Sequence, residues 1–161
     1  MELKLIPATL PQMHELVKLA FDGDTELLNL YHISPGTLDH CVVHTMNFIV
    51  ENEAAYKQDM EFYSVRLNGI KIGYTVVIRN EHEPNELYSF GININYRKSE
   101  ILEKWMAEIK NMLGGSYFVA LWGKNKRAIN FMERNGLEVY RISHYLNEEI
   151  KSLRICPQEV S

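Results

Sequence analysis

The stretch Tyr88-Ser89-Phe90-Gly91-Ile92-Asn93-Ile94, with the turn Asn95-Tyr96-Arg97-Lys98 after it, decides the fold predicted for this chain. Residues 88–94 alternate between apolar and polar side chains and are rich in strand formers, which predicts a β-strand. Ser99 then occupies the position of a helix N-cap. Apolar residues at helical spacing follow it: Ile101, Leu102, Trp105, Met106, Ile109, Met112 and Leu113. Gly114-Gly115 ends this helix, because glycine adopts left-handed dihedral angles at little cost.

The next segment predicts a parallel pair of strands. Residues 117–122 are nearly all apolar, which is typical of a strand buried on both faces. A short helix follows, with Ala128, Ile129 and Met132 on one side, and Asn135-Gly136 closes it. A strand, a helix and a strand without a hairpin indicate a right-handed crossover. In such a unit, a phosphate group binds at the first turn and at the N-terminus of the helix after it.

The rest of the chain supplies further strands and helices. Residues 3–9 predict a strand and residues 11–20 a helix with proline in its first turn. Ser34-Pro35-Gly36 opens a second helix that runs to about Glu53. Two hairpins are predicted: residues 62–67 with 70–78 about Asn68-Gly69, and residues 142–146 with 150–155 about Asn147-Glu148.

The predicted order is β-α-α-β-β-β-α-β-α-β-β, an α/β (α+β layered) domain with a mixed β-sheet and helices on both faces. The length of 161 residues is that of one domain, 1–161, with one sizeable core. We expect seven apolar residues of the crossover region in this core: Trp105, Ile109, Phe118, Val119, Leu121, Ile129 and Val139.

Composition excludes several classes of function. The net charge of −4 provides no basic field for nucleic acid or an anionic membrane. No apolar run approaches the roughly twenty residues that cross a bilayer, and the N-terminus lacks the features of a signal peptide. The two cysteines, Cys41 and Cys156, form no CxxC pair, which favours a reducing compartment and a cytoplasmic location.

Three polar groups have both a functional and a structural interpretation. His40 and His44 are four residues apart and share a helix face, as a metal-binding pair or as solvated side chains. His82, with Glu81, Glu83 and Glu86, provides a general base or a solvated loop. A basic cluster consists of Lys124, Lys126, Arg127 and Arg134. It is interpreted either as a contact for a phosphate group or as a solvated helix face.

The layout resembles the GCN5-related N-acetyltransferase (GNAT) fold. The most specific match is Asn125-Lys-Arg-Ala-Ile-Asn-Phe-Met-Glu-Arg-Asn-Gly-Leu137, which is similar to the family segment N-x-x-A-I-x-x-Y-E-K-x-G-F. The resemblance implies that the fourth and fifth strands splay apart and that acyl-CoA lies in the gap. If acyl-CoA is bound, the implied contacts are Ile92 and Ile94 for pantetheine, Arg97, Lys98 and Ser99 for the diphosphate turn, and Asn125.

Three residues depart from the family pattern. Glu100 and Leu102 replace glycines of the diphosphate turn, where backbone amides approach phosphates closely. A carboxylate at Glu100 repels two phosphate charges. Met132 replaces a tyrosine that often protonates the leaving thiolate, and a thioether donates no proton.

A second resemblance is to GNAT-like virion-associated proteins of short-tailed phages, through the segment Trp122-Gly-Lys-Asn-Lys-Arg-Ala-Ile-Asn-Phe131. It implies a particle component, located in the virion or the host cytoplasm. From the departures we expect a non-catalytic binding or structural module, with a protein partner or an oligomeric assembly, no cofactor and no assigned catalytic residue. The alternative is an acyl-CoA-dependent N-acetyltransferase, with acetyl-CoA as cofactor and an altered diphosphate-binding turn.

Overall fold

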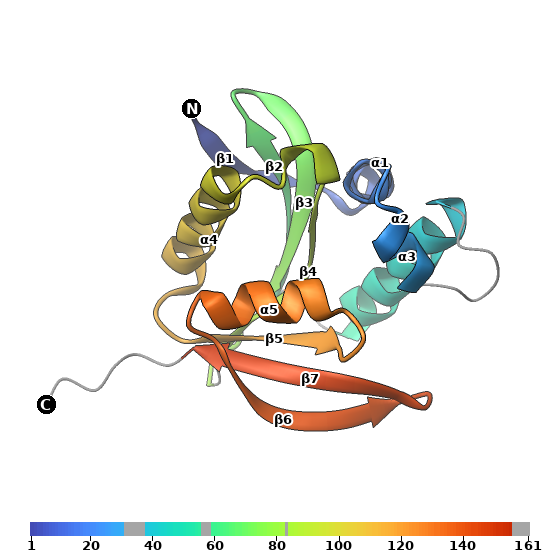
Figure 1. Ribbon diagram of the computed structural model, residues 1–161. Helices are drawn as coiled ribbons and strands as arrows, with labels where there is room; N and C mark the ends of the chain where they lie inside the picture. The colour runs from blue at the N-terminus through green and yellow to red at the C-terminus, as the bar shows by residue number, and fades with distance from the viewer. Residues whose placement is uncertain (31–37, 56–58, 83, 156–161) are drawn as a thin grey trace, which may run out of the picture.

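The computed structural model describes residues 1–30, 38–55, 59–82 and 84–155. The strands of this part of the chain form a seven-stranded sheet in the order β1-β2-β3-β4-β5-β7-β6 (Figure 1). The strands are β1 (Leu3–Ala8), β2 (Met60–Leu67), β3 (Ile70–Ile78), β4 (Asn85–Ile92), β5 (Tyr117–Trp122), β6 (Glu138–Tyr145) and β7 (Glu148–Ile155). The helices are α1 (Leu10–Phe21), α2 (Thr25–Leu30), α3 (Leu38–Ala55), α4 (Ser99–Leu113) and α5 (Lys126–Arg134), with a 3₁₀ turn η1 (Ile94–Tyr96).

Helices cover both faces of the sheet, as the alternation of strands and helices predicted. On one face, α4 and α5 contribute Trp105, Ile109 and Ile129 to an apolar cluster with β3, β4, β5 and β7. On the other face, α1, α2 and α3 pack against β3 through a second cluster. The predicted inward face of α1 is confirmed, since Met13, Leu16, Val17 and Ala20 are all buried.

The first four strands are antiparallel and locally connected. The two-residue hairpin between β2 and β3 is confirmed, with φ of 51° at Asn68 and 85° at Gly69. A register shift opposite Val76 and Val77 leaves Tyr88 as an extra residue in β4. At Gly73 a Cβ atom would lie 2.0 Å from the carbonyl oxygen of Gly91, so only glycine allows β3 and β4 to approach this closely.

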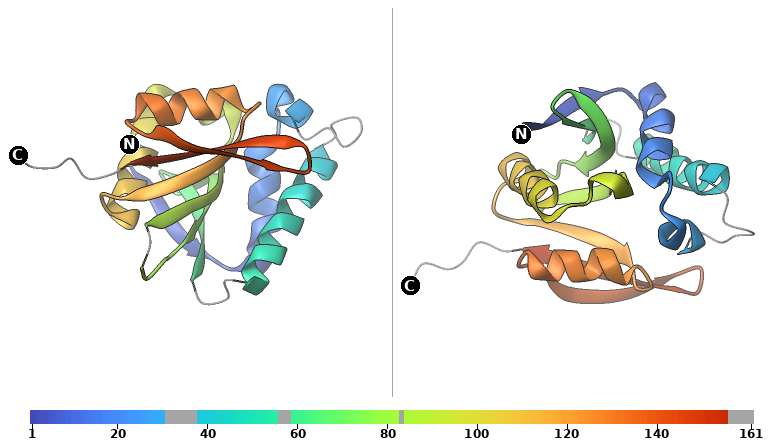
Figure 2. Two further views of the ribbon diagram at one scale, coloured as in Figure 1. Left: turned by 90° about the horizontal axis from the view of Figure 1, so that it is seen from below. Right: turned by 45° about the horizontal axis from the view of Figure 1, so that its top comes forward.

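The strands β4 and β5 are parallel but pair over a very short length. Their register contains only Asn85 with Tyr117 and Glu86 with Phe118. Beyond these pairs the two strands diverge, and β5, β7 and β6 turn away from the first four strands (Figures 1 and 2). The predicted splay is therefore present, and it separates residues 87–92 of β4 from the far half of β5.

Several boundaries differ from the sequence-based prediction. The strand predicted to reach Ile94 ends at Ile92, because the Asn93 side chain accepts a hydrogen bond from the amide of Asn95 and starts η1. Lys98, not Ser99, is the N-cap of α4, and Ser99 is its first residue. The last hairpin turns at Leu146 and Asn147, which have φ of 48° and 65°, so the predicted turn at Asn147-Glu148 is one residue late.

The helix count and the predicted core also need correction. The described residues contain five α-helices instead of four, because residues 25–30 form a separate short helix, α2. Val139 is 38% exposed and not in the core, since β6 is the edge strand of the sheet. Phe118 and Leu121 are half-buried on a strand that is not buried on both faces, whereas the rest of the predicted core is buried: Trp105, Ile109, Val119 and Ile129.

Some predictions lie outside the described residues. These are the helix start at Ser34-Pro35-Gly36 and the second cysteine, Cys156. Cys41 is buried and free. None of the helices among the described residues has the length and apolarity needed to cross a membrane.

Candidate functional site

A cavity of about 700 Å³ lies where β4 and β5 diverge. Tyr88 to Ile92 of β4 form one wall, and Ala120 to Trp122 of β5 form another. Helices close the remaining sides: α1, α2 and α3 through Phe21, Leu27 and Phe48, and α5 through Ala128 and Phe131. The volume falls in the range of ligand pockets, roughly 300–1,000 Å³.

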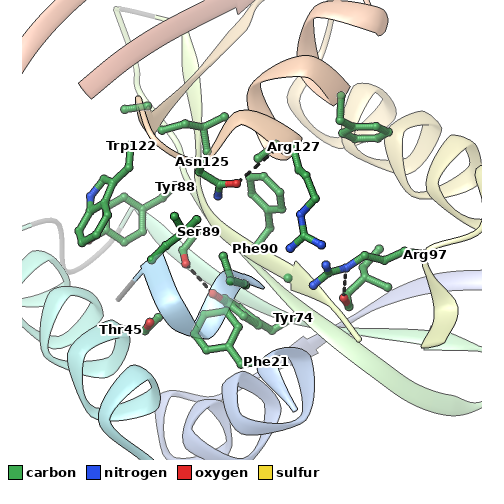
Figure 3. A pocket seen from close by; sticks show the side chains of 18 of the residues that line it. Phe21, Thr45, Tyr74, Tyr88, Ser89, Phe90, Arg97, Trp122, Asn125 and Arg127 are labelled. Atoms are coloured by element: carbon green, nitrogen blue, oxygen red, sulfur yellow. Dashed lines mark hydrogen bonds between the residues drawn. The ribbon is translucent and has the colours of Figure 1, made fainter. Parts of the chain in front are cut away.

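Hydroxyl groups line this mostly apolar space. The hydroxyl of Tyr74 and Oγ of Ser89 are hydrogen-bonded at 2.8 Å, and the Tyr88 hydroxyl donates to the carbonyl oxygen of Phe48 at 3.1 Å (Figure 3). Thr45 lines the cavity from α3 and is only 7% exposed. Its Oγ1 has no hydrogen-bond partner among the described residues. This hydroxyl oxygen is itself buried, so it does not face the open part of the cavity.

A second cavity of about 380 Å³ adjoins the first. Leu30, His44, Phe48 and Trp122 line both. Polar groups of α3, of the turn after β5 and of the β6–β7 hairpin complete the second cavity: Asn47, Glu51, Lys124, Tyr145 and Glu148. The shared residues place the two cavities next to one another.

His44 lies at the junction of the two cavities. Its ring packs edge-on against Phe48 and Trp122, with centroids 5.1 and 5.8 Å apart. Burial lowers the pKa of His44, so its imidazole is neutral at pH 7 and able to accept a proton. The structure does not support a metal site at His40 and His44. His40 is exposed, and no cluster of three ligating side chains occurs in the described part of the chain.

Two other titratable groups from the sequence analysis lie away from the cavities. Burial raises the pKa of Glu86 to about 7, but this carboxylate lines neither cavity. Nε2 of His82 lies 3.9 Å from Oε2 of Glu81, and both side chains are 88% exposed, which fits the solvated-loop interpretation.

One end of the first cavity carries arginines. Arg97, from the turn between β4 and α4, donates from Nε to the carbonyl oxygen of Ile92 at 2.7 Å. Its Nη1 donates to Asp24, which also accepts from Nη2 of Arg127 at 2.8 and 2.9 Å. Figure 3 shows the guanidinium groups of Arg97 and Arg127 close to one another at one side of Phe90.

Asp24 is fully buried between these arginines. Burial by itself raises the pKa of this carboxyl, but hydrogen bonds from the Leu27 amide and the two arginines outweigh burial and hold the pKa below its usual value. The local sequence around Asp24 predicts no role in a site for this residue. Its place before Thr25 as the residue that caps a short helix was the available signal.

The structure brings four of the six predicted cofactor residues to the cavity. Ile92, Ile94, Arg97 and Asn125 line it, and Asn125 also caps α5 by accepting from the Ala128 amide at 3.4 Å. Lys98 and Ser99 are exposed at the start of α4, outside the cavity wall. A binding role for these six residues stays a prediction.

The three departures from the family pattern have distinct positions. Glu100 is exposed and does not line the cavity. Leu102 is half-buried, packs on the α4 side of the core and lines the cavity. Met132 is completely buried in that core, and Phe131 is the aromatic residue of α5 that lines the cavity instead. Neither residue offers a hydroxyl.

The basic cluster separates into different environments. Lys124 lies 3.0 Å from Glu148 and 4.7 Å from the centroid of the Trp122 ring. Arg127 pairs with Asp24 and Glu26, Arg134 lines the cavity, and Lys126 is exposed. The cluster is thus not one solvated face.

Comparisons with known proteins identify the fold. No family model and no curated protein matches this chain. An acetyltransferase from Thermus thermophilus superposes with a TM-score of 0.65 at 17% identity over 96% of both chains. A probable GNAT-family acetyltransferase from Chromobacterium violaceum gives a TM-score of 0.70 at 12% identity, over 97% of this chain and 83% of that one. PaiA N-acetyltransferase from Thermoplasma acidophilum, in complex with coenzyme A, gives a TM-score of 0.63 at 13% identity, over 94% of this chain and 98% of that one.

The TM-scores of these superpositions establish a shared fold. The chain has the GNAT fold, and the predicted α/β architecture with a mixed sheet is confirmed. The resemblance to phage virion proteins finds no support in these matches, which are acetyltransferases.

Proposed function

We propose that this protein is an N-acyltransferase that binds the pantetheine arm of an acyl-CoA between β4 and β5 and acylates an amine that enters through the second cavity. The observation that carries the proposal is the cavity of about 700 Å³ at the splayed strands.

The residues present fit an acyl-CoA. On the side of β5, the edge of β4 from residue 87 to residue 91 has no strand partner in the described pairing, so backbone groups are accessible to the two amides of a pantetheine. The apolar wall matches the carbon skeleton of the arm. Arg97, Arg127 and Arg134 line the cavity at sites suited to phosphate groups.

The proposed chemistry assigns one proton transfer to the protein. When bound, the acyl-CoA supplies an activated thioester carbonyl, to which the amine nitrogen bonds as the carbon–sulfur bond breaks. His44 lines both cavities and is neutral at pH 7. In this proposal it accepts the proton that the amine nitrogen loses, after a side-chain rotation exposes Nε2, which is buried in the structure. The same imidazolium, or water, returns a proton to the departing sulfur, because Phe131 and Met132 have none to give.

His44 is a better candidate for this role than Glu86. Glu86 lies near the start of β4 and its pKa of about 7 suits a base, but geometry takes priority over pKa, and Glu86 lines neither cavity. In an assay of thiol release from acetyl-CoA with a panel of primary amines, we expect His44→Gln to lose most of the activity, roughly 10²-fold or more. Glu86→Gln retains it if the assignment is right.

Isothermal titration with acetyl-CoA tests the binding step. We expect micromolar binding to the unmodified chain and loss of binding in Ala120→Trp, which fills the cavity from β5. Ala107→Trp is the matched control, because Ala107 is exposed on α4 away from the cavity, and it should bind normally. Absence of binding to the unmodified chain, or equal binding by Ala120→Trp, would refute the proposal.

The same experiments separate this function from the non-catalytic module expected from the sequence. Binding of acetyl-CoA without thiol release for any amine would favour the module. The cytoplasmic location and the protein partner expected from the sequence stay predictions.

A further inference from the structure

Asp24 joins three elements that surround one end of the cavity. It lies between α1 and α2, and its Oδ1 accepts from the amide of Leu27 at 3.1 Å, which caps α2. Its carboxylate also accepts from Arg97, just before α4, and from Arg127, in the first turn of α5. The contact with Arg127 spans 103 positions of sequence.

The position of this contact matters because both arginines line the cavity. Arg97 belongs to the turn ahead of α4, and Arg127 to the start of α5, on the other side of the divergence between β4 and β5. Asp24 therefore links the two sides of the cleft at its charged end, and α2 lies beside the start of α5 (Figures 1 and 2).

The charges at this end cancel. Arg97 and Arg127 bring two positive charges, and Asp24 and Glu26 bring two negative ones, with Glu26 3.4 Å from Nη1 of Arg127. Asp24 is 0% exposed, so its pairing is weakly screened by solvent. An incoming phosphate thus meets arginines that are already neutralised.

We propose that Asp24 is an internal counter-anion that neutralises Arg97 and Arg127 from behind the cavity wall and so sets the affinity for phosphate-bearing ligands. The proposal rests on the proposed function, which takes the donor's phosphates to this end of the cavity. A phosphate group that enters the cavity competes with the buried carboxylate of Asp24 for Arg97 and Arg127 and displaces it from them. Because the same carboxylate caps α2, its displacement releases the first turn of α2, whose Leu27 lines the cavity.

Three probes separate the phosphate site from the rest of the cleft. Pantetheine has the arm without phosphate, inorganic diphosphate has the phosphates without the arm, and coenzyme A has both. We expect Asp24→Asn to bind coenzyme A and diphosphate about tenfold more tightly than the unmodified chain. Its affinity for pantetheine should stay unchanged, because the amide of asparagine still accepts from Leu27 but no longer neutralises the arginines.

Glu26→Gln is the second variant, because Glu26 has a side chain 65% exposed and its replacement does not endanger folding. This replacement removes one of the two carboxylates that pair with Arg127. We expect the variant to bind diphosphate and coenzyme A two- to threefold more tightly. Arg127→Gln should lower both affinities. In thermal melts, diphosphate should raise the midpoint more in Asp24→Asn than in the unmodified chain, and this readout requires no activity.

Two outcomes overturn the proposal. Equal or weaker binding of diphosphate by a folded Asp24→Asn means that Asp24 positions the arginines for the ligand and does not compete with it. An unchanged affinity in Glu26→Gln has the same meaning if Asp24→Asn does not fold. Failure of the proposed function looks different, since pantetheine would then bind to no variant while the diphosphate comparison still decides the role of Asp24.

Discussion

The indole Nε1 of Trp105 donates a 3.1 Å hydrogen bond to Oγ1 of Thr75 in the interior of the protein. Trp105 is 1% exposed and Thr75 0% exposed. The bond ties α4 to the middle of β3, directly behind the strand that lines the cavity. It satisfies a donor that water does not reach.

We expect Thr75→Val to lower the free energy of unfolding by about 1–3 kcal/mol, because it keeps the volume but leaves the indole N–H unsatisfied. Thr75→Ser is the matched control, since it keeps the hydroxyl and loses one methyl group, at a cost of about 1 kcal/mol. Urea denaturation measures both. A valine variant as stable as the serine variant would contradict the importance of this bond.

Gly73 makes a sharper case, because no side chain fits there. We expect Gly73→Ala to lose at least about 3 kcal/mol or not to fold, as its Cβ would lie 2.0 Å from Gly91 O and 3.0 Å from Ile92 Cα. Gly114→Ala serves as the comparison: no atom lies within 4 Å of its Cβ, but φ is +83°. It should lose about 1–3 kcal/mol, because φ of 83° with ψ of −166° is a backbone conformation that almost only glycine adopts. Equal losses in the two variants would show that β3 and β4 separate without cost.

His44 gives the stability of the protein a pH dependence below neutrality. Its pKa in the folded state is lowered by burial, so the unfolded state binds more protons as the pH falls below about 6.5. Stability from this residue is present above that pH and is lost in acid, by no more than about 1.4 kcal/mol per pH unit. We expect a shallower decline between pH 7 and pH 5 in His44→Gln than in the unmodified chain.

The control for His44 is His14→Gln, because His14 is exposed on α1. Chemical denaturation at several pH values should give His14→Gln the slope of the unmodified chain. Identical slopes for all three proteins would mean that His44 is hydrated in the folded state.

Glu86 acts in the opposite direction. Burial raises its pKa from 4.5 to about 7, so the folded state holds a proton that the unfolded state releases as the pH rises above about 4.5. Its contribution to stability is present below pH 4.5 and lost as the pH passes through 7. We expect Glu86→Gln to be more stable than the unmodified chain by about 2 kcal/mol at pH 8 and equally stable at pH 4. Glu81→Gln, with a side chain 88% exposed, should show no such difference.

Most of the fold was predictable from local sequence patterns. The inward face of α1, the Asn68-Gly69 hairpin and the helical spacing of α4 depend on residues close in sequence, and each was predictable from spacing alone. The register of β4 with β5 was not, because their pairing and its end after Glu86 depend on how α4 returns the chain. Val139 shows the same limit, since an apolar residue in a strand pattern is buried only if another element covers it.

The candidate site was harder to predict for a related reason. Asn125 and Arg97 stand in or next to recognisable segments, and both line the cavity. Asp24 and Arg127 lie 103 positions apart, and nothing in either local pattern reveals their contact. His44 was visible as one of a helical pair, but its position between two cavities arises only when α3 meets β5.

The short pairing of β4 with β5 also divides the sheet into regions with different rates of amide exchange. Along β4, the amides of residues 87–91 that point toward the gap have no strand partner there in the described pairing, so their exchange with solvent needs no unfolding of the core. Amides that bond across to β3 exchange only when that part of the sheet opens. An occupant with amide groups at peptide spacing would slow the first set and leave the second unchanged. The gap between β4 and β5 is thus an unfilled strand position in the sheet, and the exchange rates of individual amides report whether a ligand fills it.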